Sequence, residues 1–260
     1  MQKLGPFYAR RAVCYISEDL NHHLRPPLKL SSRLQTINKL VSKPYQHIWD
    51  CCCDHGFLGM ALLKRSMAAK VHFVDIVKPL MDELSLSLQD LNSANLWKVH
   101  CLDVAQLPLV NEEKVLESEV GSLVNSVIPV PRHLIIIAGV GGERLIELMQ
   151  GIIAKHPAIH LDFILCPVHH NFKVREYLAA QSMGLIEEVL IKENKRFYEV
   201  LKVSTKGHRN ISLVGNEMWD LDDADHQLYL QRTIEHYQFK LNDSSLDARK
   251  IISLYKRLTE

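Results

Sequence analysis

Hydrophobic residues along most of the chain follow two alternating spacings. Short runs of consecutive apolar residues, typical of buried strands, are followed by stretches in which apolar residues recur every three or four positions, typical of amphipathic helices. The clearest run is His133-Leu-Ile-Ile-Ile-Ala138, which is rich in β-branched residues and predicts a central strand. Pro79 opens a helical pattern whose apolar stripe includes Leu80 and Leu84.

The two spacings together predict an α/β fold. Strands are expected over 45–53, 70–76, 97–102, 133–138, 161–165, 185–191 and 198–204. Helices are expected from Ser31 to Pro44 and over 57–66, 79–91, 143–155 and 173–181, with a helix and loop within 106–131. Strands that alternate with helices form a parallel sheet covered on both faces, so we expect a Rossmann-like doubly wound sheet. The last two strands are close enough in sequence to pair as an antiparallel hairpin.

The ends of the chain have different patterns. Residues 1–28 lack periodicity and are expected to be an N-terminal extension, so the α/β domain is predicted over 29–205. Residues 206–260 contain two amphipathic stripes separated by Asn242-Asp-Ser-Ser245, which predict a C-terminal helical hairpin. Such a hairpin is expected to clasp a partner, to pack on the domain, or to form a homodimer.

Composition and charge restrict the class of protein. The 260 residues carry a net charge of +1, which excludes a disordered tail or a histone-like polycation. Residues 1–44 and 191–209 are locally basic, with balances of +6 and +4, and are expected to contact phosphates or simply to be solvated. The sequence contains no apolar run of about 18 residues, so no membrane span is predicted. Six cysteines, three of them consecutive at 51–53, fit free thiols and a cytoplasmic protein.

Acidic residues follow three successive predicted strands. They are Asp50, Asp75 and Asp103, and the first stands in a turn that ends at Gly56. Ligands of doubly wound sheets bind outside the carboxyl ends of the strands, so these side chains should lie near one crevice. There the turn can approach the methionine carboxylate of S-adenosylmethionine (SAM), Asp75 can bind its ribose hydroxyls, and Asp103 its adenine amino group. Each acid taken alone could instead cap a turn or a helix.

Small residues follow the fourth predicted strand. Ala138 and Gly139 are expected to contact the cofactor, and together with Gly141 they would let a substrate base approach the methyl group. Val104 would pack against the cofactor's adenine. No G-x-G-x-x-G follows any strand, so an NAD-dependent enzyme is excluded. The histidine pairs at 22–23 and 169–170 suggest a metal, but adjacent residues on a strand or helix cannot easily share one, and we predict no metal site.

Five segments carry a resemblance to a known family. The sequence resembles the TrmK family of bacterial SAM-dependent tRNA methyltransferases in the segments 30–34, 50–58, 137–142, 165–167 with Arg175, and 192–199. The resemblance implies a class I SAM-dependent methyltransferase fold and methylation of N1 of adenine 22 in tRNA. It also implies substrate contacts for Arg33, Gly141, Arg175 and Tyr198, although Arg33 alone could equally be a surface residue.

Catalysis by such an enzyme requires little proton transfer. Adenine N1 attacks as a neutral nitrogen, and the cationic product loses a proton from N6 more readily, so a carboxylate near the amino group would help. Asp54 is the candidate for this role, with His55 as its hydrogen-bonding neighbour. The base would have to be extruded from the folded tRNA.

The chain departs from the TrmK pattern at three positions. Cys52 replaces a glycine of the first turn and is expected to lie beside the cofactor, Cys166 replaces a glutamine, and Val140 replaces a methionine. Two alternatives therefore remain open. One is a catalytically weakened scaffold that binds SAM or RNA, and the other is a methyltransferase with a different acceptor.

Overall fold

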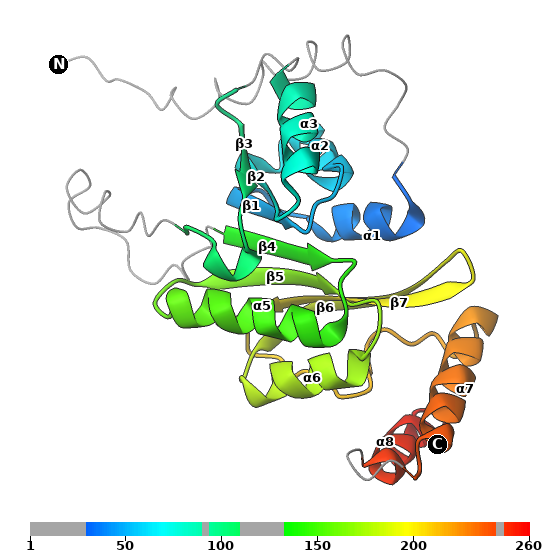
Figure 1. Cartoon of the computed structure of the whole chain (residues 1–260). Coiled ribbons are helices and arrows are strands. Elements are labelled where there is room, and N and C mark those ends of the chain that lie inside the picture. Colours follow the sequence, from blue (N-terminus) through cyan, green and yellow to red (C-terminus); the bar gives the residue numbers. More distant parts are fainter. Residues whose placement is uncertain (1–29, 90–93, 110–132, 243–246) are drawn as a thin grey trace, which may run out of the picture.

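A single seven-stranded sheet forms the centre of the molecule (Figure 1). The computed structural model describes residues 30–89, 94–109, 133–242 and 247–260. The sheet order is β3-β2-β1-β4-β5-β7-β6. The strands are β1 (Tyr45–Cys51), β2 (Ala68–Asp75), β3 (Trp97–Cys101), β4 (His133–Ala138), β5 (Leu161–Cys166), β6 (Gly184–Glu193) and β7 (Arg196–Ser204). The strands β1 to β5 pair in parallel, whereas β7 is antiparallel to both β5 and β6. This confirms the predicted doubly wound sheet and its final hairpin.

Helices cover both faces of the sheet. They are α1 (Ser32–Leu40), α2 (Phe57–Lys64), α3 (Lys78–Gln89), α5 (Gly142–Lys155) and α6 (Asn171–Ala180), with the 3₁₀ helix η2 (Val104–Gln106). Side chains of α1, α2 and α3 pack in one apolar cluster, and those of α5, α6 and η2 in another. The strand β4 supplies both clusters, with Ile135 and Ile137 on the α5 face and Leu134 and Ile136 on the opposite face. This two-sided burial explains why β4 has no polar alternation.

A row of histidines crosses the sheet from β1 to β3. His47 Nδ1 lies 3.1 Å from His72 Nε2, and His72 Nδ1 lies 2.9 Å from His100 Nε2. The Trp49 ring stacks on His72 at 3.8 Å and its Nε1 donates to His133 Nδ1 at 3.1 Å. Burial lowers the pKa of His72 to about 2 and that of His100 to about 4, and neighbouring histidines add to the effect at His72. The folded sheet therefore holds these rings neutral.

The C-terminal residues form a helical hairpin beside the sheet (Figure 1). It consists of α7 (Ala224–Phe239) and α8 (Ala248–Lys256), followed by the 3₁₀ helix η3 (Arg257–Thr259). A third apolar cluster joins Leu230, Ile251 and Tyr255 of the hairpin to Phe172 of α6. The acidic segment before α7 caps that helix, since the Asp223 carboxylate accepts from two backbone N–H groups of its first turn.

Some sequence predictions lie outside the described residues. They are the N-terminal extension 1–28, the histidine pair 22–23, and most of the helix and loop within 106–131. Among the residues that the structure describes, no helix combines the length and the apolar character needed to cross a membrane.

Candidate cofactor and acceptor site

The carboxyl ends of β1, β2 and β3 lie side by side at one edge of the sheet. Asp50 lies one residue before the end of β1 and pairs in register with Phe73 of β2. Asp75 is the last residue of β2 and pairs with Cys101 of β3. The Cys52 thiol is half-buried, and the negative charges of Asp75, Asp50 and Asp103 disfavour its thiolate form. Burial, reinforced by these carboxylates, raises the pKa of Cys52 to about 11. The Leu102 N–H donates to the Asp75 carbonyl oxygen at 3.1 Å, and Asp103 follows Leu102 directly. The three acids therefore lie at the carboxyl ends of three adjacent strands, as the sequence predicted.

The turn between β1 and α2 has an unusual backbone. Cys52, Asp54 and Gly56 adopt φ values of 55°, 51° and 70°. A Cβ at Gly56 would lie 2.8 Å from Leu84 Cδ1, so a side chain there would require the Leu84 side chain to shift. Cys52 holds the left-handed conformation that glycine adopts most easily, at the position where the TrmK pattern has glycine. Its side chain packs against the apolar cluster under α5.

Asp50 anchors this turn to the helix that follows. Its Oδ2 accepts from the backbone N–H of Gly59 at 2.8 Å, and the residue is 4% exposed. Burial raises the pKa of Asp50 to about 7, against the effect of the Gly59 hydrogen bond and with a contribution from Asp75. Asp50 thus holds the turn against the first residues of α2.

Asp75 lies nearer the surface. Its Oδ1 accepts from Val77 N at 3.1 Å and its Oδ2 from Asp54 N at 3.4 Å. These bonds orient the carboxylate at the edge of the sheet, where each oxygen retains a free lone pair for a further donor.

Asp103 has a partner that the sequence did not reveal. Its Oδ1 caps η2 by accepting from Ala105 N at 3.0 Å. Arg144, from the first turn of α5, lies with Nη2 at 3.3 and 3.4 Å from the two carboxylate oxygens of Asp103, and also pairs with Glu147 at 3.1 Å. Asp103 Oδ2 accepts only from Arg144 among the described residues, so it retains a lone pair for a ligand. Val104 beside it is 3% exposed and belongs to the core cluster.

A second group of residues surrounds the end of β4. The Arg33 guanidinium carbon lies 4.9 Å from the centroid of the Tyr198 ring, and its Nη atoms would lie 3.9 Å from a Cβ at Gly139. The Arg33 backbone N–H donates to Glu193 Oε1 at 2.8 Å, whereas its buried side-chain Nε has no hydrogen-bond partner among the described residues. Three predicted residues, from α1, β4 and β7, therefore meet, and Ala138 lies partly buried beside them.

Cys166 ends β5 behind this group. It is completely buried, and its carbonyl oxygen accepts from Gly139 N at 3.1 Å. Burial raises the pKa of its thiol to about 12, so it stays protonated at neutral pH.

The glycine turn after β4 is covered by the loop after β5. A Cβ at Gly141 would lie 2.4 Å from His169 Cε1, and one at Gly142 would lie 2.8 Å from the His169 carbonyl oxygen. Only glycine fits at these positions without a shift of the loop.

The same loop brings two histidines and a glutamate close enough together to share a metal ion. Glu143, His169 and His170 each offer one ligand atom within 4.8 Å of the others. The pair at 169–170 lies in a turn, where His170 has a φ of 62°, so the geometric reason for excluding a shared metal does not apply. The Lys173 ammonium, 3.3 Å from Glu143 Oε1, competes with a cation there.

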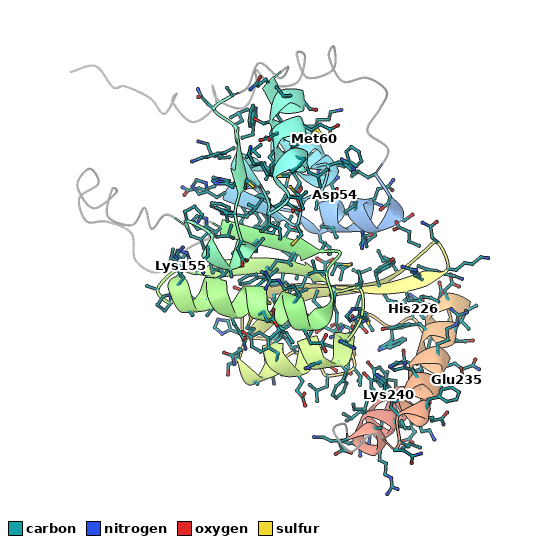
Figure 2. All side chains as sticks on the ribbon, viewed as in Figure 1. Asp54, Met60, Lys155, His226, Glu235 and Lys240 are labelled. Carbon is teal, nitrogen blue, oxygen red and sulfur yellow. The ribbon has the colours of Figure 1, made fainter. Side chains whose placement is uncertain are left out.

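Asp54 lies at the surface of the part of the molecule that carries α1, α2 and α3 (Figure 2), and the next residue, His55, is exposed as well. Their side chains are 69% and 53% exposed, with His55 Nε2 3.6 Å from Asp54 Oδ1. Both side chains are accessible to a substrate, and among the described residues neither side chain makes a further hydrogen bond, although the Asp54 backbone N–H donates to Asp75 Oδ2.

Arg175 does not reach a substrate, which corrects the sequence prediction. Its side chain is 0% exposed. It donates to Glu199 Oε2 and to Glu188 Oε2 at 2.6 Å each, and to the Ser212 carbonyl oxygen at 3.1 Å. It also lies 3.5 Å from Met218 Sδ. All its donors point inward, so Arg175 holds β6, β7 and the segment before α7 together.

Comparisons with known proteins agree with this architecture. A family model described as "Methyltransferase domain" matches residues 30–201. A Mycoplasma pneumoniae protein named as a candidate tRNA methyltransferase is 25% identical over 236 residues, covering 87% of this chain and 99% of its own.

Solved structures share the fold. The B. subtilis m1A22 tRNA methyltransferase TrmK has a TM-score of 0.63 at 19% identity, covering 89% of this chain and 100% of its own. A Streptococcus pneumoniae candidate tRNA (m1A22) methyltransferase, solved with S-adenosyl-L-methionine, has a TM-score of 0.65 at 19% identity, with 89% and 100% covered.

Proposed function

The chain belongs to the methyltransferase-domain family, and from that premise we propose that it transfers the methyl group of SAM to N1 of an adenine in tRNA. The observation that carries the proposal is that Asp50, Asp75 and Asp103 lie at the carboxyl ends of three adjacent strands, where Asp75 also accepts a hydrogen bond from the turn through Asp54 N. The relatives named for tRNA methylation, one of them solved with SAM, support both the cofactor and the acceptor.

The residues present fit SAM. The left-handed turn ending at Gly56 offers backbone N–H groups to the methionine carboxylate, and Asp75 offers oxygens to the ribose hydroxyls. Asp103 offers its Oδ2 to the adenine amino group. Because Cys52 packs against the core, its thiol fits beside the cofactor and leaves the turn accessible.

The second group of residues would hold the acceptor base. Ala138, Gly139 and Gly141 leave room for a flat base at the end of β4. The Tyr198 ring and the Arg33 guanidinium supply one wall, and the unpartnered Arg33 Nε is a donor for a substrate oxygen. We assign Asp54 as the carboxylate that faces the amino group of the base, with His55 beside it.

SAM supplies an electrophilic methyl group, and the chain supplies position and charge. The methyl group would be taken up by adenine N1 while the carbon–sulfur bond breaks and sulfur keeps the bonding electron pair, so the ring would carry the positive charge that Asp54 faces. No base is needed before attack. The carboxylate of Asp54 stabilises the cationic ring and accepts the N6 proton if it is lost, and solvent then removes that proton.

Two finer assignments accompany this proposal. We propose residues 29–205 as the methyltransferase domain and 206–260 as an appended hairpin, because the hairpin packs in an apolar cluster separate from the two that cover the sheet and joins α6 through Phe172. Its free surface is a candidate homodimer contact, since Phe239 is 90% and Leu241 45% exposed. Light scattering on the purified chain and on Phe239→Ser would test the dimer.

The variant Asp75→Asn tests the cofactor site. Incubated with labelled SAM and tRNA, wild-type protein should transfer label, and Asp75→Asn should bind SAM roughly ten- to a hundredfold more weakly, because one charge-assisted hydrogen-bond acceptor is lost. Asp82→Asn is the matched control, since Asp82 is exposed on α3 and pairs only with Lys78 among the described residues. Equal SAM affinity of the two variants would refute the assignment, and SAM binding without transfer would favour the scaffold alternative.

A further inference from the structure

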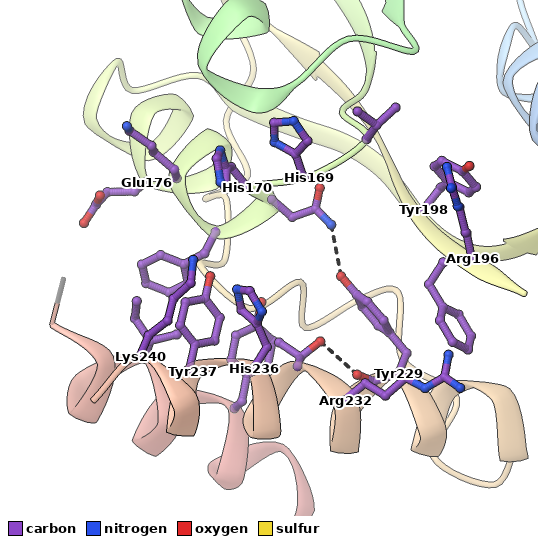
Figure 3. Close-up of a pocket in the computed structure, with 18 of the residues that line it drawn as sticks. His169, His170, Glu176, Arg196, Tyr198, Tyr229, Arg232, His236, Tyr237 and Lys240 are labelled. Carbon is purple, nitrogen blue, oxygen red and sulfur yellow. Dashed lines mark hydrogen bonds between the residues drawn. The ribbon is translucent and has the colours of Figure 1, made fainter. Parts of the chain in front are cut away.

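A cleft of about 730 Å³ separates the sheet from the C-terminal hairpin (Figure 3). One wall consists of the loop after β5, the first turns of α6 and the tip between β6 and β7, and the other consists of α7 and α8. Its volume lies within the range of roughly 300–1,000 Å³ that is typical of ligand sites. None of the residues assigned above to the cofactor lines this cleft.

The cleft is rich in positive charge. Six basic residues line it, and three acids. The basic residues are Lys173, Lys195, Arg196, Arg232, Lys240 and Lys250, and the acids are Glu143, Glu176 and Asp247. Lys173 is paired with Glu143, but Arg196, Arg232 and Lys240 have no ion-pair partner within the part of the chain that the structure describes. An anionic ligand is therefore favoured.

Aromatic rings lie between these cations. Of the aromatic residues that line the cleft, Phe197, Tyr229 and Tyr237 are partly exposed, whereas Phe172, Tyr198 and Tyr255 are buried. The Arg232 guanidinium lies 5.8 Å from the Phe197 ring centroid, and Figure 3 shows Tyr229, Tyr237 and the Arg232 side chain rising from the same helix. Cations that follow a backbone and rings on which bases stack are the two features of sites for single-stranded nucleic acid.

The walls are held in place without a ligand. The Tyr229 hydroxyl of α7 donates to Glu199 Oε1 on β7 at 2.7 Å and accepts from Asn171 Nδ2 on α6 at 3.0 Å. The Phe172 ring meets the Tyr237 ring edge-on at 6.3 Å. Binding would therefore cost little reorganisation of the protein.

The cleft continues from the proposed acceptor site. Tyr198 lines the cleft and also packs on Arg33. His169 likewise lines the cleft and covers Gly141. A chain with one base at Gly139 would pass these two residues on its way into the cleft.

We propose that this cleft binds the unpaired RNA segment adjacent to the methylated adenine, with its phosphates at Arg196, Arg232 and Lys240. The inference rests on the proposed function, because it takes RNA as the substrate. A base that leaves its stack to be methylated splays the neighbouring backbone at the same time, and the cleft receives that backbone.

Charge reversal on the hairpin wall tests the inference. The double variant Arg232→Glu/Lys240→Glu alters the cleft, and Arg249→Glu/Lys256→Glu, on exposed positions of α8 outside it, is the charge-matched control. Binding of an unmodified tRNA transcript and of a labelled single-stranded RNA oligomer is measured by fluorescence anisotropy over a range of salt. The cleft variant should bind about tenfold more weakly, with a slope of log K against log salt smaller by roughly 1.4, since two contacts are lost. The control should change less than twofold.

A second variant distinguishes loss of RNA contacts from disruption of the hairpin. Arg196→Glu lies on the opposite wall, at the start of β7, and should weaken RNA binding in the same direction while SAM affinity stays unchanged. RNA binding by the cleft variants equal to that of the control would overturn the inference, whether or not tRNA is methylated. Charge-dependent RNA binding by a wild-type protein that methylates no tRNA would instead leave the cleft assignment standing and contradict the proposed function.

Discussion

Cys52 shows how one residue departs from an otherwise recognisable turn. Its φ of 55° costs a residue with a Cβ about 1–2 kcal/mol relative to glycine, and the surrounding turn has to impose it. The sequence indicated the substitution of glycine by cysteine at this position. It could not show where the thiol would go, because that depends on the apolar cluster under α5.

Removal of the thiol separates backbone strain from packing. Cys52→Gly and Cys52→Ala lose the same sulfur contact, but only alanine keeps the strained Cβ. We expect Cys52→Gly to have a free energy of unfolding about 1 kcal/mol higher than that of Cys52→Ala, measured by urea denaturation. An alanine variant at least as stable as the glycine variant would show that the turn is not strained.

Arg175 illustrates a residue whose role sequence reasoning missed. Its partners Glu188 and Glu199 lie on different strands, and only the pairing of β6 with β7 brings both carboxylates onto the same guanidinium. No spacing in the sequence reports that register, so a buried ion-pair network was predicted as a substrate contact.

Loss of this guanidinium should destabilise the fold. Arg175→Met leaves two buried carboxylates without their partner and should lower the free energy of unfolding by about 3–5 kcal/mol. Lys78→Met, which breaks an exposed pair with Asp82, is the control and should cost less than about 1 kcal/mol. Thermal and urea unfolding of both variants measure the difference, and comparable losses would argue against the buried network.

Secondary structure elements were predictable where apolar periodicity was strong. The strand β4 and the helix α5 lie within one residue of their predicted bounds, because burial on both faces or on one stripe leaves a clear pattern. The start of α6 was predicted at Lys173 but lies at Asn171. His170 sets that start through its left-handed conformation, which hydrophobic spacing does not encode.

The histidine row makes the sheet sensitive to acid. His72 and His100 have folded-state pKa values of about 2 and 4, below the unfolded value of about 6.5, so the unfolded chain binds more protons as the pH falls. The free energy of unfolding is therefore unaffected by these two histidines above about pH 6.5, and it decreases below that pH, because protons then bind the unfolded chain in preference to the folded one. His72→Gln should therefore lose less stability than wild type between pH 6.5 and 4.5, in urea unfolding at each pH. Exposed His208→Gln is the control, and parallel pH profiles for all three proteins would contradict the account.

At the scale of the whole molecule, the proposed sites are formed by residues from several elements that are distant in sequence. The acids at three strand ends were predictable, because the carboxyl ends of parallel strands share one edge of the sheet. The contact of Arg144 with Asp103 was not predicted. The position of Arg144 in the first turn of α5, directly after the glycine turn, could have indicated a cation near these acids. The cleft was not predictable either, since α6, β7, α7 and α8 each contribute only a few of its residues.

The identity of the methylated nucleoside tests the central claim most directly. Unmodified tRNA is incubated with SAM and the protein, digested to nucleosides and examined by mass spectrometry, with Asp75→Asn in parallel. The account predicts 1-methyladenosine as the new product with wild-type protein and a strongly reduced yield with Asp75→Asn. A different methylated nucleoside, or none from a protein that binds SAM, would contradict it.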